Sequence, residues 1–257
     1  VADTMLVACH QFADDNKYSV VNNEGTVYWQ NANVELNDPR NVDLTGTTVR
    51  MDVNSGTTAL TYSQPVMFTV KATTAPTILS ASDIAALNTT HSSFFKKLSH
   101  RVPNAIFGQY NGCMIKVLGT ELDVNRGGNT LSFFNKQESF TIGRRGQLEQ
   151  PIYKGYEGTI SSVTVYPREV SQFHFKCPNL QLEGVASFTF LKIERSNCKV
   201  TGLVITEGSV WPSSVREVVQ ALDCSKLVLE DWDCLAMPLG TTSAGGIYCF
   251  TGSHIVD

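Results

Sequence analysis

The feature that most constrains the fold is the regular recurrence of short apolar strands from about residue 158 onward. In each of these segments apolar and polar side chains alternate, which is the pattern of a half-buried β-strand. The segments are 163–166, 172–175, 180–182, 188–193, 202–206, 226–229 and 247–250. A period of about 20–30 residues, with one or two strands in each unit, is typical of a solenoid in which successive coils stack on one another.

Four cysteines recur with these strands. They stand at positions 177, 198, 224 and 249, so the last two gaps are nearly equal and the first is shorter. Equivalent positions in stacked coils form columns through the core of a solenoid. We therefore expect these cysteines to occupy one column as small buried apolar side chains. The chain has seven cysteines and no CxxC pair, so the sequence predicts neither a disulfide framework nor a zinc site.

Two kinds of solenoid fit this period, a leucine-rich repeat and a parallel β-helix. A helix ahead of the strand at 226–229 would favour the leucine-rich repeat. Helical spacing after a capping box is found in one set of residues: Ser214, Val215, Glu217, Val218, Val219 and Leu222. Only this coil has such a helix, however, and the asparagine or cysteine of the leucine-rich consensus is misplaced. We therefore predict an all-β chain that forms a parallel β-helix, with the helix as an inserted turn.

Residues 1–75 are expected to begin the same solenoid. An apolar face predicts a helix within 2–15, and Asp3 or Thr4 is available to cap it. Short strands are expected at 19–21, 26–29, 34–36, 47–51 and 66–71, separated by turns rich in Asn and Gly.

Residues 76–151 are predicted to form a compact inserted subdomain with a small β-sheet of its own. Helical periodicity covers 80–87 and continues at 94–98. Strands are expected at 113–118, 121–124, 131–134 and 139–142, followed by a tight turn at 144–146. The predicted organisation is a capping helix and first coils in 1–75, the insertion in 76–151, and further coils in 152–257. We expect the chain to continue beyond Asp257.

Composition argues against several function classes. The net charge is −4 and no long run of Lys or Arg occurs, so no nucleic-acid partner is expected. The densest basic stretch, which contains Lys96, Lys97, His100 and Arg101, is predicted to be a solvated face. No apolar run is long enough to span a bilayer, so no membrane insertion is expected. The five histidines show no metal-ligand spacing and no nucleotide signature occurs, so neither a metal nor another cofactor is predicted.

The order of these elements resembles that of a known family. After the initial helix the chain reads YSVV at 18–21, GTVYW at 25–29 and VDLTGT at 42–47. This opening resembles the pectate-lyase-like β-helix of bacteriophage tailspikes, in which the helix closes the first coil. The segments 180–183, 188–194 and 200–206 are similar to ordinary coils of that fold. The segment 114–151 is similar to a small module inserted near the start of several tailspikes.

The resemblance implies a right-handed parallel β-helix that assembles as a homotrimer on a virion tail with other phage tail proteins. It also implies recognition of a polysaccharide at the bacterial cell surface, either capsule or O-antigen, and its depolymerisation by a hydrolase or a lyase. It carries over no catalytic residue, because active sites differ between tailspikes. Exposed aromatic side chains that a trimer would cover are expected at Phe94, Phe95 and Phe107.

Carboxylates near the ends of the last strands are the candidate catalytic groups. Sugar hydrolysis uses two carboxyl groups, about 5 Å apart in retaining enzymes and further apart in inverting ones. The step along the chain from Glu207 to Asp233 equals the step from Cys198 to Cys224. If that step is one coil, the two carboxylates lie on neighbouring strands about 5 Å apart. Glu230 is the reserve, because alternation in its strand turns it outward.

Trp211 and Trp232 are the candidate substrate-binding residues, since indole rings stack on sugar rings near the same strand ends. Two other functions remain open. The chain could be a non-catalytic structural or adhesin part of a phage tail fibre. Alternatively, it could be a free bacterial polysaccharide lyase.

Overall fold

The structure is a computed structural model. It describes residues 20–21, 25–29, 33–37, 41–51, 66–123, 135–182, 189–207, 209, 218–235, 248–251 and 254–255. The helix expected within 2–15, the strand expected at 131–134 and the side chain of Trp211 lie outside these residues. The described part is mostly β-structure, as predicted, and the helices are short. None of the helices described is long and apolar enough to cross a membrane.

Three parallel sheets form the larger part of the molecule, which we call the three-sheet body. Sheet A contains β1 (Val20–Val21), β4 (Val42–Asp43), β11 (Phe173–Lys176), β14 (Cys198–Thr201), β17 (Ser225–Glu230) and β20 (His254–Ile255). Sheet B contains β2 (Gly25–Trp29), β5 (Thr47–Met51), β12 (Asn179–Leu182), β15 (Val204–Ile205) and β18 (Asp233–Cys234). Sheet C contains β3 (Val34–Leu36), β6 (Val66–Lys71), β13 (Thr189–Glu194), β16 (Val219–Leu222) and β19 (Tyr248–Thr251).

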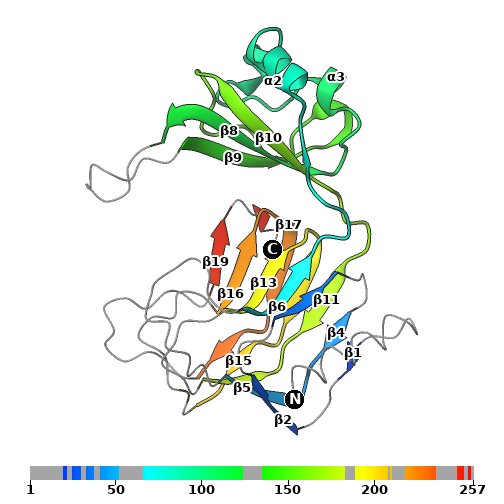
Figure 1. The fold of residues 1–257 in the computed structure, drawn as a ribbon, viewed down its shortest axis with the longest axis vertical. Helices are drawn as coiled ribbons and strands as arrows, with labels where there is room; N and C mark the ends of the chain where they lie inside the picture. Colours follow the sequence, from blue (N-terminus) through cyan, green and yellow to red (C-terminus); the bar gives the residue numbers. More distant parts are fainter. Residues whose placement is uncertain are drawn as a thin grey trace.

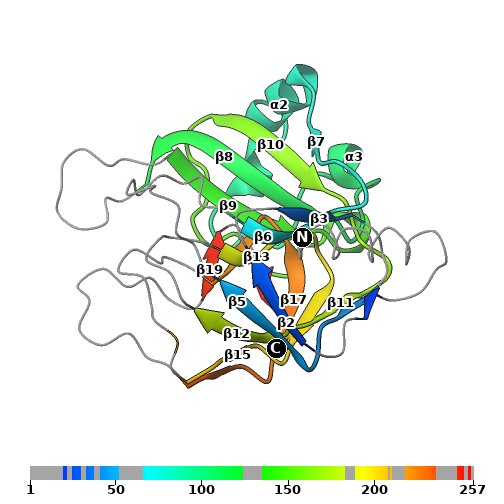
Figure 2. The same ribbon diagram turned by 60° about the horizontal axis from the view of Figure 1, so that its bottom comes forward.

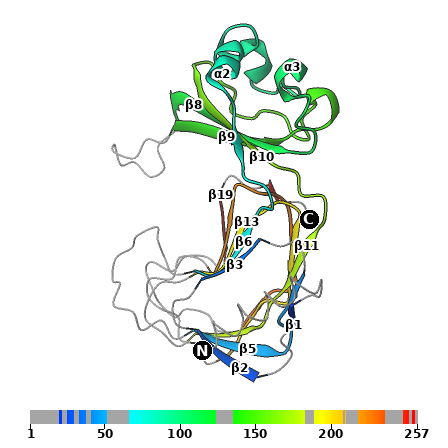
Figure 3. The same cartoon turned by 45° about the vertical axis from the view of Figure 1, so that its right-hand side comes forward.

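The chain visits these sheets in strict rotation. Successive strands belong to sheets A, B and C in turn, and each strand pairs in parallel with the strand one circuit earlier. Figure 3 shows the sheets on three sides of a common interior, and Figure 2 shows the strands of sheet B from below. The side chains that alternate inward from all three sheets therefore share one core.

The circuits differ in length, and this overturns the predicted cysteine column. Phe173, Cys198 and Leu227 are in register in sheet A, so the second of these circuits is longer than the first. Cys224 precedes β17, and Cys249 belongs to sheet C. The cysteine spacing misled because the connections between strands vary in length. The prediction of small buried side chains is confirmed for Cys177, Cys198 and Cys224, all of which are free thiols.

Aromatic side chains hold the interior of the three-sheet body together. Phe68 of sheet C lies 5.4 Å from Phe175 of sheet A and 5.7 Å from Phe190, measured between ring centroids. The rings meet edge to face, the arrangement that aromatic quadrupoles prefer. The core therefore joins strands that are far apart in the chain.

The corner between sheets C and A requires a left-handed backbone conformation. Asn197 and Lys226 precede paired positions in β14 and β17, and their φ angles are 59° and 57°. Asparagine tolerates this conformation, whereas lysine adopts it at a cost.

The helix predicted around 215–222 is wrong in its described part, because residues 219–222 form strand β16. Pairing with β13 and β19 outweighs the local helical spacing, so this segment forms a strand.

A second unit, which we call the antiparallel module, lies between β6 and β11 (Figure 1). Its sheet has the order β7-β10-β8-β9 and is entirely antiparallel. The module contains β7 (Thr77–Ile78), α2 (Ala81–Asn88), η1 (Ser92–Phe95), α3 (Asn104–Phe107), β8 (Met114–Leu122), β9 (Asn135–Thr141), η2 (Arg144–Gly146) and β10 (Ile160–Tyr166). The strand expected in the solenoid at 163–166 is therefore part of β10, because apolar alternation alone does not specify which sheet a strand joins.

The antiparallel module has its own apolar core. Phe95 and Phe107 are completely buried, and the half-buried Phe94 packs against the same core. The expectation of exposure for a trimer contact is therefore wrong for Phe95 and Phe107, which the module buries itself, whereas Phe94 is partly exposed. Lys96, Lys97, His100 and Arg101 are exposed, which confirms the predicted solvated face.

The two connections to the module are fixed by a buried ion pair. The Glu169 carboxylate accepts hydrogen bonds from the Thr73 amide (2.7 Å) and hydroxyl, and it lies 3.4 Å from the guanidinium of Arg195. Arg195 is completely buried and lies over the Phe173 ring. Thr73 lies in the connection that leads into the module, and Glu169 lies in the connection that leads out of it. Arg195 follows β13 of the three-sheet body, so the cluster attaches both connections to the body.

A second polar contact sets the module against a later corner of the body. The Asp223 carboxylate accepts hydrogen bonds from Lys116 Nζ (2.8 Å) and from the Tyr166 hydroxyl (2.9 Å). Burial raises the pKa of the Tyr166 hydroxyl, and the charge of Asp223 raises it further, so this hydroxyl is a donor at neutral pH. Asp223 has a φ of 49°, so the contact is made from a strained position.

Candidate functional site

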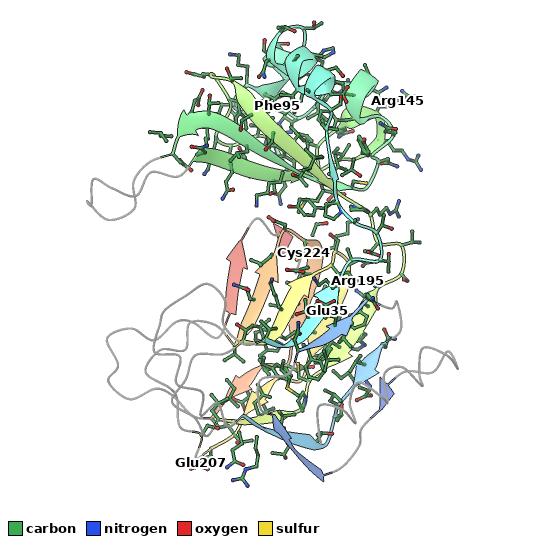
Figure 4. The ribbon with its side chains drawn as sticks, in the orientation of Figure 1. Glu35, Phe95, Arg145, Arg195, Glu207 and Cys224 are labelled. Atoms are coloured by element: carbon green, nitrogen blue, oxygen red, sulfur yellow. The ribbon has the colours of Figure 1, made fainter. Side chains whose placement is uncertain are left out.

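The register of the strands separates the two leading catalytic candidates. Asp233 pairs with Val204, and Glu207 lies beyond that position, in a turn after β15. The two carboxylates are therefore not at equivalent positions on neighbouring strands, and that expectation is wrong. The circuit here runs from Val204 to Asp233, so it is longer than the step from Cys198 to Cys224. Both side chains are exposed, and Figure 4 shows Glu207 at the end of the molecule farthest from the module.

The reserve candidate and the described tryptophan lie in different environments. Glu230 is exposed at the end of β17 and faces outward, as predicted, with its carboxylate 2.6 Å from Lys199 Nζ. Trp232 is partly buried and packs against the interior of the three-sheet body. Much of its indole therefore contributes to the core, and Trp211 lies outside the described residues.

A group of polar side chains gathers on the outer face of sheet A around Glu230. The sequence Phe173-His174-Phe175-Lys176 buries both phenylalanines and turns the two polar side chains outward. The parallel register then aligns His174 with Lys199, and Lys176 with Asp43 and Thr201. We call this group the sheet A cluster: Asp43, His174, Lys176, Lys199, Thr201 and Glu230.

Hydrogen bonds and ion pairs connect the cluster across four strands. His174 Nε2 lies 3.0 Å from Thr201 Oγ1. Lys176 Nζ lies 2.6 Å from Asp43, and Lys199 Nζ lies 2.6 Å from Glu230. Each lysine is therefore held by a carboxylate on a neighbouring strand, Asp43 on β4 and Glu230 on β17, and the imidazole and hydroxyl are in contact between the two pairs.

The electrostatics keep His174 neutral. Partial burial lowers the pKa of its imidazole, and the positive charges of Lys199 and Lys176 lower it further. The carboxylates of Asp43 and Glu230 oppose this shift without reversing it. Burial would raise the pKa of Asp43, but hydrogen bonds from Lys176 and Thr45 hold it below its usual value.

This arrangement supplies groups that acid–base chemistry needs. A neutral imidazole accepts a proton, and the nearby carboxylate, ammonium and hydroxyl groups bind hydroxyl groups of a ligand. Strands about 4.8 Å apart repeat such groups along the face. Among the described residues, no three His, Cys, Asp or Glu side chains gather closely enough to hold a metal ion.

Sequence reasoning found Glu230 but missed the rest of the cluster. The signal that could have found His174 and Lys176 is the alternation in Phe173–Lys176, which turns both side chains outward. Their neighbours could not be identified without the register, because Asp43 pairs with Lys176 from a distant part of the chain, on the other side of the antiparallel module. The sequence matches no protein-family model, and comparison with curated proteins finds no significant match.

Proposed function

We propose that the three-sheet body is a right-handed parallel β-helix of the tailspike kind and that it binds a bacterial surface polysaccharide. The observation that carries this proposal is the strict rotation of the chain through sheets A, B and C. A stacked coil presents similar positions at a regular interval, which suits a polymer that repeats its own chemical groups. The resemblance of the opening segments to tailspikes supports a homotrimer on a phage tail, together with other tail proteins.

We further propose that the polysaccharide lies across the outer face of sheet A and is cleaved there. In this proposal His174 accepts a proton from the attacking group, and Glu230, after leaving Lys199, relays a proton from solvent to the leaving sugar oxygen. The neutral state of His174 and its contact with Thr201 support the first role. The exposure of Glu230 supports the second. Glu207 and Asp233 stay as predicted catalytic residues, and Trp211 and Trp232 stay as predicted sugar-stacking residues.

Clearing of capsule by the full-length protein tests the activity. Purified protein is spotted on lawns of capsulated bacteria, and release of oligosaccharides is measured. His174→Gln and Glu230→Gln are each expected to lower the cleavage rate about 10²–10⁴-fold, the usual contribution of an acid–base group. Glu207→Gln and Asp233→Asn are measured beside them.

Glu35→Gln is the matched control. Glu35 is also an exposed carboxylate paired with a lysine, 3.4 Å from Lys71 Nζ, but it lies on the outer face of sheet C. The control is expected to cleave at the wild-type rate. Full cleavage by both the His174 and the Glu230 variants would remove the sheet A cluster from the mechanism.

A non-catalytic adhesin is the second candidate function. The observation in its favour is that both lysines of the sheet A cluster are already paired with carboxylates, as in a static polar surface. An adhesin binds the polysaccharide and releases no oligosaccharide. The adhesin function would be supported if the wild-type protein binds fluorescently labelled capsule and releases no oligosaccharide.

A further inference from the structure

Two adjacent arginines stand at a turn of the antiparallel module, far from the sheet A cluster. Arg145 has a φ of 56° and a ψ of 34°, and the next residue, Gly146, has a φ of 71°. The Gly143 amide donates to the Gln147 carbonyl, and the Gln147 amide donates back to the Arg144 carbonyl. Figure 4 shows Arg145 at the outer edge of the module, at the opposite end of the molecule from Glu207.

A neighbouring segment holds this turn in place. The Val102 amide donates to the Gly146 carbonyl at 2.8 Å, and Arg101 pairs with Gln147 in an antiparallel bridge. Gly146 leaves no room for a side chain, since an added Cβ would lie 2.4 Å from the Val102 carbonyl oxygen. The backbone therefore fixes the positions from which Arg101, Arg144 and Arg145 extend, and we call these three residues the arginine turn.

The arginine turn is exposed and forms no ion pair with any described residue. Most described lysines differ, because they are paired with carboxylates in both units: Lys71, Lys176, Lys192 and Lys199 in the body, and Lys116, Lys136 and Lys154 in the module. The charge of the chain is also unevenly divided. Residues 77–166 contain 9 Lys and Arg against 6 Asp and Glu, a net charge of +3, whereas the rest of the chain carries −7.

Arg145 adopts a backbone conformation that glycine would occupy without strain. The guanidinium group is planar and presents its donors in a fork that matches carboxylate, sulfate and phosphate oxygens. An exposed arginine that is held on a fixed turn and pairs with no described carboxylate is therefore suited to bind an anion.

We propose that the arginine turn is a binding site for the anionic groups of an acidic polysaccharide, such as carboxylate or sulfate groups. That the ligand is a polysaccharide rests on the proposed function. That it is anionic rests only on the arginine turn. The module would then hold an acidic chain outside the sheet A cluster and need no catalytic group of its own.

Binding of defined polymers tests this site on the full chain. The probes are polygalacturonate, which carries carboxylates, heparin, which carries sulfates, and neutral dextran. The wild-type protein is expected to bind at least one acidic probe, more weakly as salt is raised, and not to bind dextran. Arg144→Gln with Arg145→Gln is expected to raise the dissociation constant about tenfold or more, the scale of a lost charge-assisted contact.

Three further variants separate recognition from charge and from folding. Lys97→Gln removes one exposed charge of the same module and should change the dissociation constant less than about twofold if binding is local to the turn. Arg144→Lys with Arg145→Lys keeps the charge and should still weaken binding, because the fork is lost. Arg145→Gly relieves the strained backbone and should lose affinity while its thermal midpoint stays equal or rises.

The outcomes are distinct from those of the catalytic site. The arginine turn is tested by binding and the sheet A cluster by cleavage, so one can fail without the other. Glu35→Gln, which changes an exposed carboxylate outside both sites, should leave binding to these probes unchanged. Equal binding by the double glutamine variant and the wild-type protein would overturn the proposal, as would an equal loss in Lys97→Gln. Unchanged binding together with a changed oligomeric mass would overturn it in favour of a contact between copies.

Discussion

The three-sheet body and the antiparallel module are built from similar short apolar strands, yet they are stabilised in different ways. In the body every strand pairs with strands one circuit away, so its core depends on the register of the whole stack. In the module β8 pairs with β9 and β10, and the core is closed within residues 79–165. The joint between them is polar, formed by Glu169 and Asp223. The molecule therefore consists of two cores that meet through ion pairs and hydrogen bonds.

Separate cores predict separate unfolding, and this is the largest effect that we expect. Phe95 is completely buried in the module and Phe175 is completely buried in the body. Phe95→Ala and Phe175→Ala should each destabilise their own unit by about 3–5 kcal/mol. All three tryptophans lie outside residues 77–166, so tryptophan fluorescence does not come from the module.

Urea unfolding followed by tryptophan fluorescence distinguishes the two variants. The midpoint should fall for Phe175→Ala and stay at the wild-type value for Phe95→Ala. Circular dichroism in the tyrosine region should show an early transition for Phe95→Ala. One shared transition in both variants would mean that the two units unfold as one.

The buried ion pair at the connections should give the next largest effect. Glu169→Gln leaves the guanidinium of Arg195 buried without its carboxylate, and such a loss costs about 3–5 kcal/mol. Because Arg195 lies in the body, tryptophan fluorescence should report the loss. Replacing both partners, as Glu169→Leu with Arg195→Met, should recover part of it. If Glu169→Gln leaves the free energy of unfolding unchanged, the ion pair does not stabilise the body.

Asp223 should affect the position of the module more than its folding. Asp223→Ala removes the acceptor shared by Lys116 and Tyr166, at a cost of about 1 kcal/mol for a half-exposed contact. Hydrogen exchange should then rise in the connections 72–76 and 167–172, while the strands of both units stay protected. Lys154→Ala, which removes an ion pair to Asp123 within the module, is the control and should leave those connections unchanged.

The smallest effect is a pH dependence confined to the body. Burial, together with Lys199 and Lys176, lowers the pKa of His174 below its usual value of 6.5. The unfolded chain therefore binds a proton more readily than the folded one, so the stability of the body is complete above about pH 6.5 and decreases as the pH falls. His174→Gln should remove this slope. A slope that persists in the variant would assign it to other groups.

Much of the secondary structure followed from sequence, but the pairing of strands did not. Alternation located strands such as 34–36, 47–51 and 66–71 because inward and outward positions differ in polarity. The same alternation occurs in β10, which joins the antiparallel sheet, so the pattern could not assign it to a sheet. Register failed for Glu207 and Asp233 because the circuit from β14 to β17 is longer than the circuit from β11 to β14. The sheet A cluster depends on that register, so the sequence alone could not predict it.

The hydrogen bonds between Thr73 and Glu169 also bear on how such a chain could diversify. They bring the two ends of the inserted module side by side. On either side of this insertion, β6 still pairs with β13 and β4 still pairs with β11. For the pairing of the body's strands, the whole inserted module is therefore equivalent to a single turn between β6 and β11. Recombination could exchange it for another segment whose ends match, and the aligned strands on either side would keep their partners. New surface chemistry, including a different choice of ligand, would then arrive in one genetic step without any redesign of the framework.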